Sequence, residues 1–120
     1  MALRPTLGGL IVVLLTAVSG AAADVEKGKT LYTACLVCHT EKPDALGPSL
    51  KGVYGRRSAA LEDFRYSNPM KRANLMWDEA NLRAYIADPQ GKVKGNRMPF
   101  GGVPSTNDVD DLVAFLKTYK

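Results

Sequence analysis

The chain has 120 residues, of which 46% are hydrophobic and 23% charged, and its formal net charge is +4 at pH 7. This length fits one small domain. The 16 basic residues are scattered and form no stripe along a predicted helix, which argues against nucleic-acid binding. Two cysteines and one histidine are too few to complete a structural zinc site.

The first 23 residues have the pattern of an export signal. Arg4 precedes an apolar run at 10–18, which only Thr16 interrupts, and three alanines follow at 21–23. The run is shorter than the ~20 apolar residues that a membrane-spanning helix needs. We therefore predict a signal peptide over 1–23 and a mature domain over 24–120. An uncleaved N-terminal membrane anchor is the alternative.

The first predicted helix begins after Asp24, a suitable N-cap, and continues to about Cys35. Its apolar face repeats at spacings of three and four residues, and comprises Val25, Gly28, Leu31, Tyr32 and Cys35. Glycine inside a helix is less stable than alanine by about 1 kcal/mol. We therefore expect a second helix to cross at Gly28, with a tolerated surface glycine as the alternative.

The most specific motif is Cys35-Leu36-Val37-Cys38-His39. Two thiols at this spacing, followed at once by a histidine, are typical of covalent attachment of a c-type haem, with the histidine as an iron ligand. A redox disulfide of the thioredoxin type would follow a strand, and no strand pattern precedes the motif. In bacteria such haem is attached outside the cytoplasmic membrane, so the motif and the export signal support each other.

The rest of the chain predicts two more helices and no convincing strand. Segment 40–66 is mostly irregular, with a short helical turn at 59–64, and is expected to pack against the haem. Asp78 caps a helix over 79–87 that Pro89 ends, and 90–104 is a loop. The last helix covers about 107–119, where Ser105 and Asp108 form a variant capping box.

The second axial ligand of the iron must be a methionine or a lysine, or the position is open, because His39 is the only histidine. Met76 precedes a helix beside a tryptophan, where an apolar residue is usually in the core. Met70 lies in a polar turn, and Met98 lies in the loop at 97–100, far from His39 along the chain. This placement favours Met98, with Met70 as the next candidate.

The segment from Asp24 to Lys120 resembles a class I cytochrome c, of the branch that includes mitochondrial cytochrome c and its bacterial relatives. The resemblance rests on residues that occur in the same order and spacing. They are Gly28, Tyr32, the haem motif, segment 47–56, Tyr66, Trp77, Leu82, Tyr85, Pro89, loop 97–100, Leu112 and Phe115. It implies an all-α fold, with three main helices and short helical turns wrapped around one covalent haem.

The resemblance also implies a role for each site residue. Cys35 and Cys38 would carry the thioether bonds, and His39 and Met98 would be the axial ligands. The remaining roles concern the surroundings of the haem: the Pro48 carbonyl would accept a hydrogen bond from His39, the propionates would contact Arg56, Tyr66 and Trp77, and Tyr85 would lie near the Met98 sulfur. Leu112 and Phe115 would face Gly28 at the helix crossing.

Four departures from the mitochondrial pattern stand out. Met70 occupies the place of an asparagine in a buried water network, and Asn96 replaces a threonine near a propionate. The segment before Cys35 and the segment between His39 and Gly47 are both shorter. The second thioether near the haem puts the water network and the tuning of the potential in doubt.

We predict a periplasmic one-electron carrier between a membrane complex or dehydrogenase and a terminal acceptor, and not an enzyme. It would be a monomer, at most peripherally associated with the membrane, that meets redox proteins through their acidic docking surfaces. The basic residues at the haem edge would be Lys29, Lys92, Lys94 and Arg97, unless these are merely solvated charges. The alternatives are a tightly bound haem subunit of a dehydrogenase and an open-site haem sensor or peroxidase.

Overall fold

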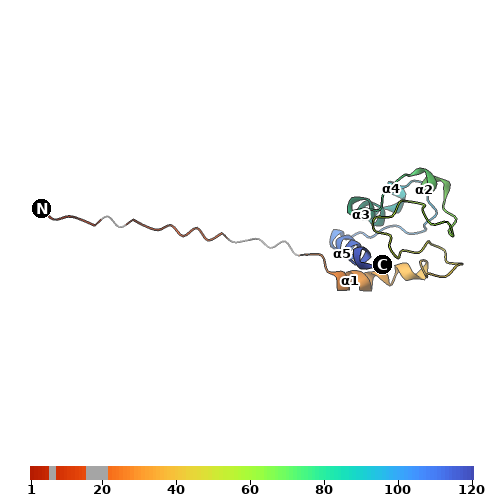
Figure 1. Cartoon of the computed structure of the whole chain (residues 1–120), viewed down its shortest axis with the longest axis horizontal. Coiled ribbons are helices and arrows are strands. Elements are labelled where there is room, and N and C mark those ends of the chain that lie inside the picture. Colours follow the sequence, from red (N-terminus) through yellow and green to blue (C-terminus); the bar gives the residue numbers. More distant parts are fainter. Residues whose placement is uncertain (6–7, 16–21) are drawn as a thin grey trace.

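The computed structural model describes residues 1–5, 8–15 and 22–120, so part of the predicted leader, including Thr16 and the alanine at 21, lies outside the described residues. The elements in chain order are α1 (Val25–Tyr32), a 3₁₀ turn η1 (Cys35–Val37), α2 (Asn68–Arg72), α3 (Glu79–Ala87), α4 (Pro89–Lys92) and α5 (Thr106–Thr118) (Figure 1). Apart from one isolated bridge between Arg57 and Met76, the described ranges contain no β pairing. This architecture confirms the predicted all-α fold with three main helices.

The leader contributes no regular structure in its described parts. Residues 8–15 form no helix, and the apolar side chains at 10–15 are exposed. Within 1–5, 8–15 and 22–120, no helix has the length and apolar character that crossing a membrane would take.

Helices α1 and α5 pack against each other at Gly28, as the sequence predicts (Figure 1). A Cβ atom at Gly28 would collide with the main-chain carbonyl of Asp111 and would lie 2.9 Å from the Cβ of Phe115. The Tyr32 ring packs on Phe115 and Tyr119, with centroid distances of 5.0 and 5.2 Å. The absence of a side chain at one position therefore lets two helices from opposite ends of the chain make close contact.

Helix α3 packs on the other side of α5. Leu82 is buried in this contact, and the Lys117 ammonium lies 2.7 Å from the Glu79 carboxylate. Arg83 pairs with Asp110 at 2.8 Å. The core that these helices enclose consists of Tyr32, Val53, Met70, Trp77, Leu82, Val93, Val109, Leu112, Val113, Phe115 and Leu116.

Two short helices were not predicted, and both begin in the same way. In α2 the Ser67 hydroxyl accepts a hydrogen bond from the Met70 N–H at 3.2 Å, and in α4 the Asp88 carboxylate accepts one from the Gly91 N–H at 3.0 Å. Each has a proline in its first turn, where the missing N–H costs nothing. Asp88 leaves helical geometry, with φ −155° and ψ 87°, but Pro89 ends α3 only to start α4, so 90–104 is not entirely loop.

Other boundaries also differ from the predictions. Helix α1 ends at Tyr32, and the chain tightens into η1 before the second cysteine. Residues 59–64 contain turns but no helix.

Met70 is 9% exposed and belongs to the core, whereas Met76 is 42% exposed. The predicted core position of Met76 was therefore wrong, and Met70 lies in an unpredicted helix rather than a polar turn, in agreement with the buried position that the resemblance implies.

Candidate haem site

The imidazole of His39 is held in one orientation by the residues at 47 and 48. His39 is 8% exposed, and its Nδ1 lies 2.6 Å from the carbonyl oxygen of Pro48. Because a carbonyl only accepts, Nδ1 carries the proton and Nε2 keeps a lone pair for a metal. A Cβ at Gly47 would lie 2.6 Å from Nδ1, so only glycine lets the main chain cover the ring.

Burial also sets the charge state of this imidazole. It lowers the pKa of His39, and the hydrogen bond to Pro48 opposes this only in part. The lowered pKa favours the neutral ring, which is the form that binds iron. The main chain reinforces the arrangement, since the Gly47 N–H donates to the Cys38 carbonyl at 3.0 Å.

The two thiols lie on one tight turn that follows α1. The N–H groups of Cys38 and His39 both donate to the Cys35 carbonyl, at 3.2 and 2.9 Å. In a 3₁₀ turn the side chains at positions i and i+3 eclipse, so the turn aims Cys35 and Cys38 toward the same side. Both thiols are partly exposed and free of disulfide bonds, and burial raises the pKa of Cys35.

Arg56 has a buried donor without a partner among the described residues. Its two terminal nitrogens donate to the carbonyls of Ser49 and Lys51, at 2.7 and 3.2 Å, but the buried Nε donates to nothing. A buried unpaired donor is costly, and it marks a place where an acceptor belongs. An anionic oxygen such as that of a haem propionate fits this requirement. The Tyr32 hydroxyl is likewise buried without a partner.

Two of the three predicted aromatic site residues lie together. Trp77 is 7% exposed and meets the Tyr85 ring edge-on at 5.1 Å. The main-chain N–H of Trp77 donates to the main-chain carbonyl of Arg56 at 2.8 Å, which links this aromatic pair to the arginine. Burial raises the pKa of Tyr85 to about 12, so its phenol stays protonated.

Tyr66 is placed by a different set of contacts. Its ring meets Phe64 edge-on at 4.9 Å, and its hydroxyl accepts a hydrogen bond from the Leu61 N–H at 3.3 Å. Tyr66 also packs against the core, but its polar contact is with the irregular segment rather than with Arg56 or Trp77.

Met98 is partly buried, and its main chain is held by Asn96. The Asn96 side-chain oxygen accepts from the Met98 N–H at 2.8 Å, while its amide nitrogen donates to the carbonyls of Pro89 and Val93, at 3.0 and 2.8 Å. Asn96 is 8% exposed, so it connects helix α4 to the methionine loop inside the protein.

From the sequence, Asn96 was interpreted only as a replacement for a threonine, and this role was not predicted. The available signal was a polar residue two positions before a candidate ligand and seven positions after a proline that follows a capping aspartate. The neighbouring Arg97 donates to the Arg65 carbonyl, which ties the same loop to the segment before Tyr66.

These residues fit a covalently bound haem. The site offers two thiols on one side of a turn, a neutral imidazole with a free Nε2, a methionine on an anchored loop and a buried cationic donor that lacks an acceptor. Thiols form thioether bonds with vinyl groups, and imidazole and thioether together suit an iron that exchanges electrons.

Comparison with known proteins gives one family. A family model described as cytochrome c matches residues 25–120. Cytochrome c2 of Blastochloris viridis is 38% identical over 98% of this chain and 94% of its own length. Cytochrome c-550 of Bradyrhizobium diazoefficiens is 36% identical over 77% of this chain and 70% of its own length. The solved structure of cytochrome cH from Methylobacterium extorquens is similar with a TM-score of 0.76 and 36% identity, covering 80% of this chain and 99% of that one.

Proposed function

Because this chain belongs to the cytochrome c family, we propose that it shuttles single electrons in the periplasm between a membrane complex or dehydrogenase and a terminal acceptor. It binds one haem c covalently, and it is a monohaem electron carrier. The relatives are electron-transfer cytochromes rather than enzymes. The partners, the compartment and the role of each residue are the parts that we propose.

The proposed roles follow from the contacts of each side chain. Cys35 and Cys38 hold the haem through thioether bonds, and the bound haem supplies reversible one-electron exchange. The Nε2 of His39 would bind the iron, because Nδ1 is engaged with the Pro48 carbonyl. Met98 would supply the second ligand and would exclude water and other ligands.

The polar surroundings fit the two propionates of a haem. The Nε of Arg56, which has no partner among the described residues, would donate to a propionate oxygen, and Tyr66 and Trp77 would also contact the propionates. A buried carboxylate is costly unless it is paired and hydrogen-bonded, so these donors would keep it charged. Tyr85, held edge-on by Trp77, would lie beside the Met98 sulfur.

The observation that carries the proposal is the position of His39. It follows the two thiols directly in the chain, and its ring is covered by Gly47 and hydrogen-bonded to Pro48. This arrangement leaves a neutral imidazole with only Nε2 free. A carrier needs this ligand fixed, because a rigid coordination sphere changes little when the electron moves.

The distal ligand is tested by replacing each candidate methionine. Met98→Ala should remove the weak red charge-transfer band of methionine-ligated ferric haem, lower the reduction potential and let the reduced protein bind carbon monoxide. Met76→Ala, at a half-exposed position, is the control and should leave all three unchanged. A Met98→Ala protein that keeps the band would show that another residue is the ligand, and loss of the band in Met70→Ala would point to Met70.

Attachment is tested separately at the first thiol. Cys35→Ala should leave at most one thioether bond, which is read from the pyridine haemochrome spectrum and the intact mass of the exported protein. Full, stable attachment in this variant would contradict the assignment.

The compartment and the partners are tested on the exported protein. Cell fractionation should place the red protein in the periplasm, with a mass that lacks the leader. Size-exclusion chromatography should give a monomer without a stoichiometric dehydrogenase. Co-purification with such an enzyme would instead favour a tightly bound haem subunit.

A further inference from the structure

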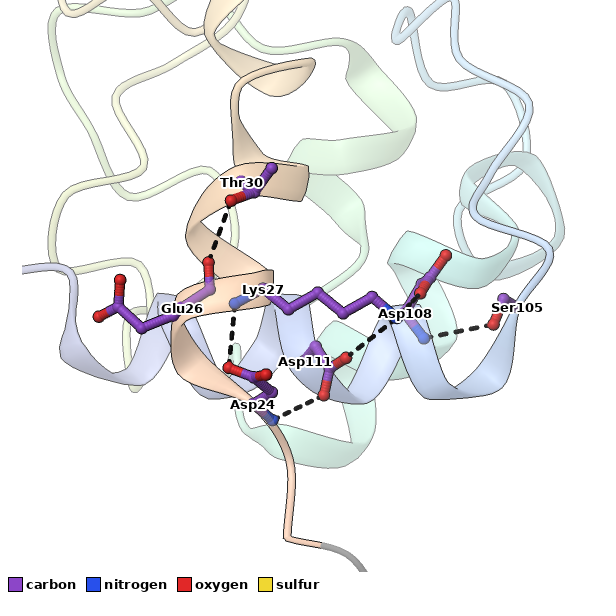
Figure 2. A network of polar contacts seen from close by, with 7 residues as sticks. All are labelled: Asp24, Glu26, Lys27, Thr30, Ser105, Asp108 and Asp111. Atoms are coloured by element: carbon purple, nitrogen blue, oxygen red, sulfur yellow. Dashed lines mark hydrogen bonds and ion pairs between the residues drawn. The ribbon is translucent and has the colours of Figure 1, made fainter.

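The main-chain nitrogen of Asp24 donates a hydrogen bond to a buried carboxylate across the α1–α5 contact. The acceptor is Oδ1 of Asp111, at 2.7 Å, and Asp111 is only 8% exposed (Figure 2). The Asp24 side chain is engaged elsewhere, since it caps α1 by accepting from the Lys27 N–H at 3.0 Å. A buried aspartate from the last helix is thus aimed at the first main-chain nitrogen of the folded domain.

The charges around this nitrogen are unbalanced. In the described part of the chain, Asp108 and Asp111 share one cation, the Nζ of Lys27, at 2.9 and 3.7 Å, while the Asp24 carboxylate accepts from the Lys27 main-chain N–H (Figure 2). Glu26 is turned away from this cluster. The next acid on α5, Asp110, is paired with an arginine of α3. The cluster therefore has room for one more positive charge.

Removal of the leader would supply that charge. Hydrolysis breaks the C–N bond between residues 23 and 24; the hydroxyl of water goes to the Ala23 carbonyl carbon and its hydrogen to the Asp24 nitrogen. At neutral pH the products are a carboxylate on Ala23 and an ammonium on Asp24, because the nitrogen takes up the proton that the acid releases. Ala22, Ala23 and Asp24 are all exposed.

We propose that processing occurs at the predicted Ala23–Asp24 bond and that the buried carboxylate of Asp111 then receives the new N-terminal ammonium as an ion pair between α1 and α5. This proposal rests on the proposed export of the protein. An ammonium at the start of a helix is opposed by the helix dipole, and a buried carboxylate is costly unless it is paired. Each group offsets the cost of the other, and 2.7 Å is within the range of charge-assisted bonds.

The pairing depends on the position of the cut. Cleavage one residue earlier would leave Asp24 with an ordinary amide N–H and put the ammonium on an exposed alanine. The contact with Asp111 is therefore a second, structural reason for a cut between Ala23 and Asp24, the position that the sequence pattern predicts.

The test compares two exported holoproteins. One is the natural precursor, and the other has two serines inserted between Ala23 and Asp24, which keeps the alanines but returns Asp24 to an amide. Intact mass should show a natural chain beginning at Asp24. The insertion should lower the melting temperature by roughly 4–8 °C in a domain of this size.

Asp111→Asn, made in both proteins, isolates the ion pair. It should lower the melting temperature of the natural chain more than that of the serine-extended one. Asp110→Asn is the matched control, and its effect should be the same in both because Asp110 pairs with Arg83. Equal effects of Asp111→Asn in the two backgrounds would overturn the ion pair.

The pH dependence gives a second readout. Pairing raises the pKa of the ammonium, so its stabilisation is complete below the ordinary value and is lost as the pH rises through the raised one. Lys27, Asp24 and Asp108 also face this site, and both proteins retain them. Only the natural chain should lose the added stability in mildly alkaline solution.

Three outcomes separate this proposal from the proposed function. A red, exported protein with any other N-terminus overturns the processing site alone, and pH profiles that coincide overturn the ion pair alone. A colourless or unexported product overturns the proposed function together with this proposal.

Discussion

At the scale of single residues, two glycines and one asparagine decide how closely segments approach. Gly28 lets α5 lie against α1, and Gly47 lets the main chain cover the His39 ring. Asn96 instead holds neighbouring segments together, because its buried side chain makes three hydrogen bonds to main-chain groups. Only the contact at Gly28 joins residues far apart along the chain, since Gly47 covers a histidine eight positions before it and the partners of Asn96 lie within seven positions.

Replacing Gly28 by alanine should destabilise the protein by about 1–3 kcal/mol, because the added methyl group would overlap the Asp111 carbonyl and crowd Phe115. The measurement is urea unfolding of the holoprotein. Gly101→Ala is the matched control, since a Cβ there meets no atom within 4 Å. Equal stability of the two variants would show that the crossing has room to spare.

Replacing Asn96 by alanine should loosen the methionine loop, because the Met98 N–H loses its acceptor and two carbonyls lose their donor. Leaving buried groups unpaired costs roughly 1–3 kcal/mol. We expect tighter binding of imidazole to the oxidised protein and a weaker red charge-transfer band. The control is Asn107→Ala, at an exposed site on α5. Unchanged imidazole affinity in Asn96→Ala would remove the positioning role.

At the scale of elements, capping residues set the ends of the helices, and ion pairs add to the contact between α3 and α5. The caps of α1, α3 and α5 are aspartate, aspartate and serine, each accepting from an N–H three residues on. The Lys117–Glu79 pair then connects α5 to α3. The hydrogen bond from Lys117, followed by its charge, lowers the pKa of Glu79 below 4.5.

A lowered pKa means that the pair stabilises the fold above the ordinary pKa of Glu79 and that this contribution is lost as the pH falls through the lowered value. Glu79→Gln should therefore be less stable than the natural protein at neutral pH, with the difference vanishing in strong acid. Urea unfolding over a pH series measures it, with Glu62→Gln in the irregular segment as the control. A difference that persists unchanged in acid would contradict the assignment.

At the scale of the whole molecule, the positive net charge favours encounters with redox partners. Cleavage after residue 23 would remove one basic residue and no acidic one, leaving a mature domain with a formal charge of +3. Lys29, Lys92, Lys94 and Arg97 are all exposed. Such a surface suits weak and fast contacts with acidic redox proteins.

Electron transfer to an acidic partner should slow as salt is added, because the screening length is about 10 Å at 0.1 M ionic strength. Stopped-flow kinetics with an acidic redox protein measures the slope. Lys92→Gln with Lys94→Gln should flatten it, whereas Lys120→Gln at the chain terminus serves as control. A rate independent of salt in the natural protein would remove the steering proposal.

Much of this protein could be read from short stretches of chain. Residues within one or two turns of each other define the haem motif, the caps of the three main helices and the glycine where α1 meets α5. All three predicted main helices are present in the structure. The short helices α2 and α4 show the same local signals, a capping side chain before a proline, and were missed because each forms only about a turn. Their length gives no periodic apolar pattern to detect.

Packing alone decided the rest. It buried Met70 and exposed Met76, which local pattern had placed the other way round. It also brought Asp111 against the nitrogen of Asp24, 87 positions away. A hydrogen bond between distant segments depends on where two helices cross. The whole core sets that position, so it cannot be predicted from the residues next to the donor or the acceptor.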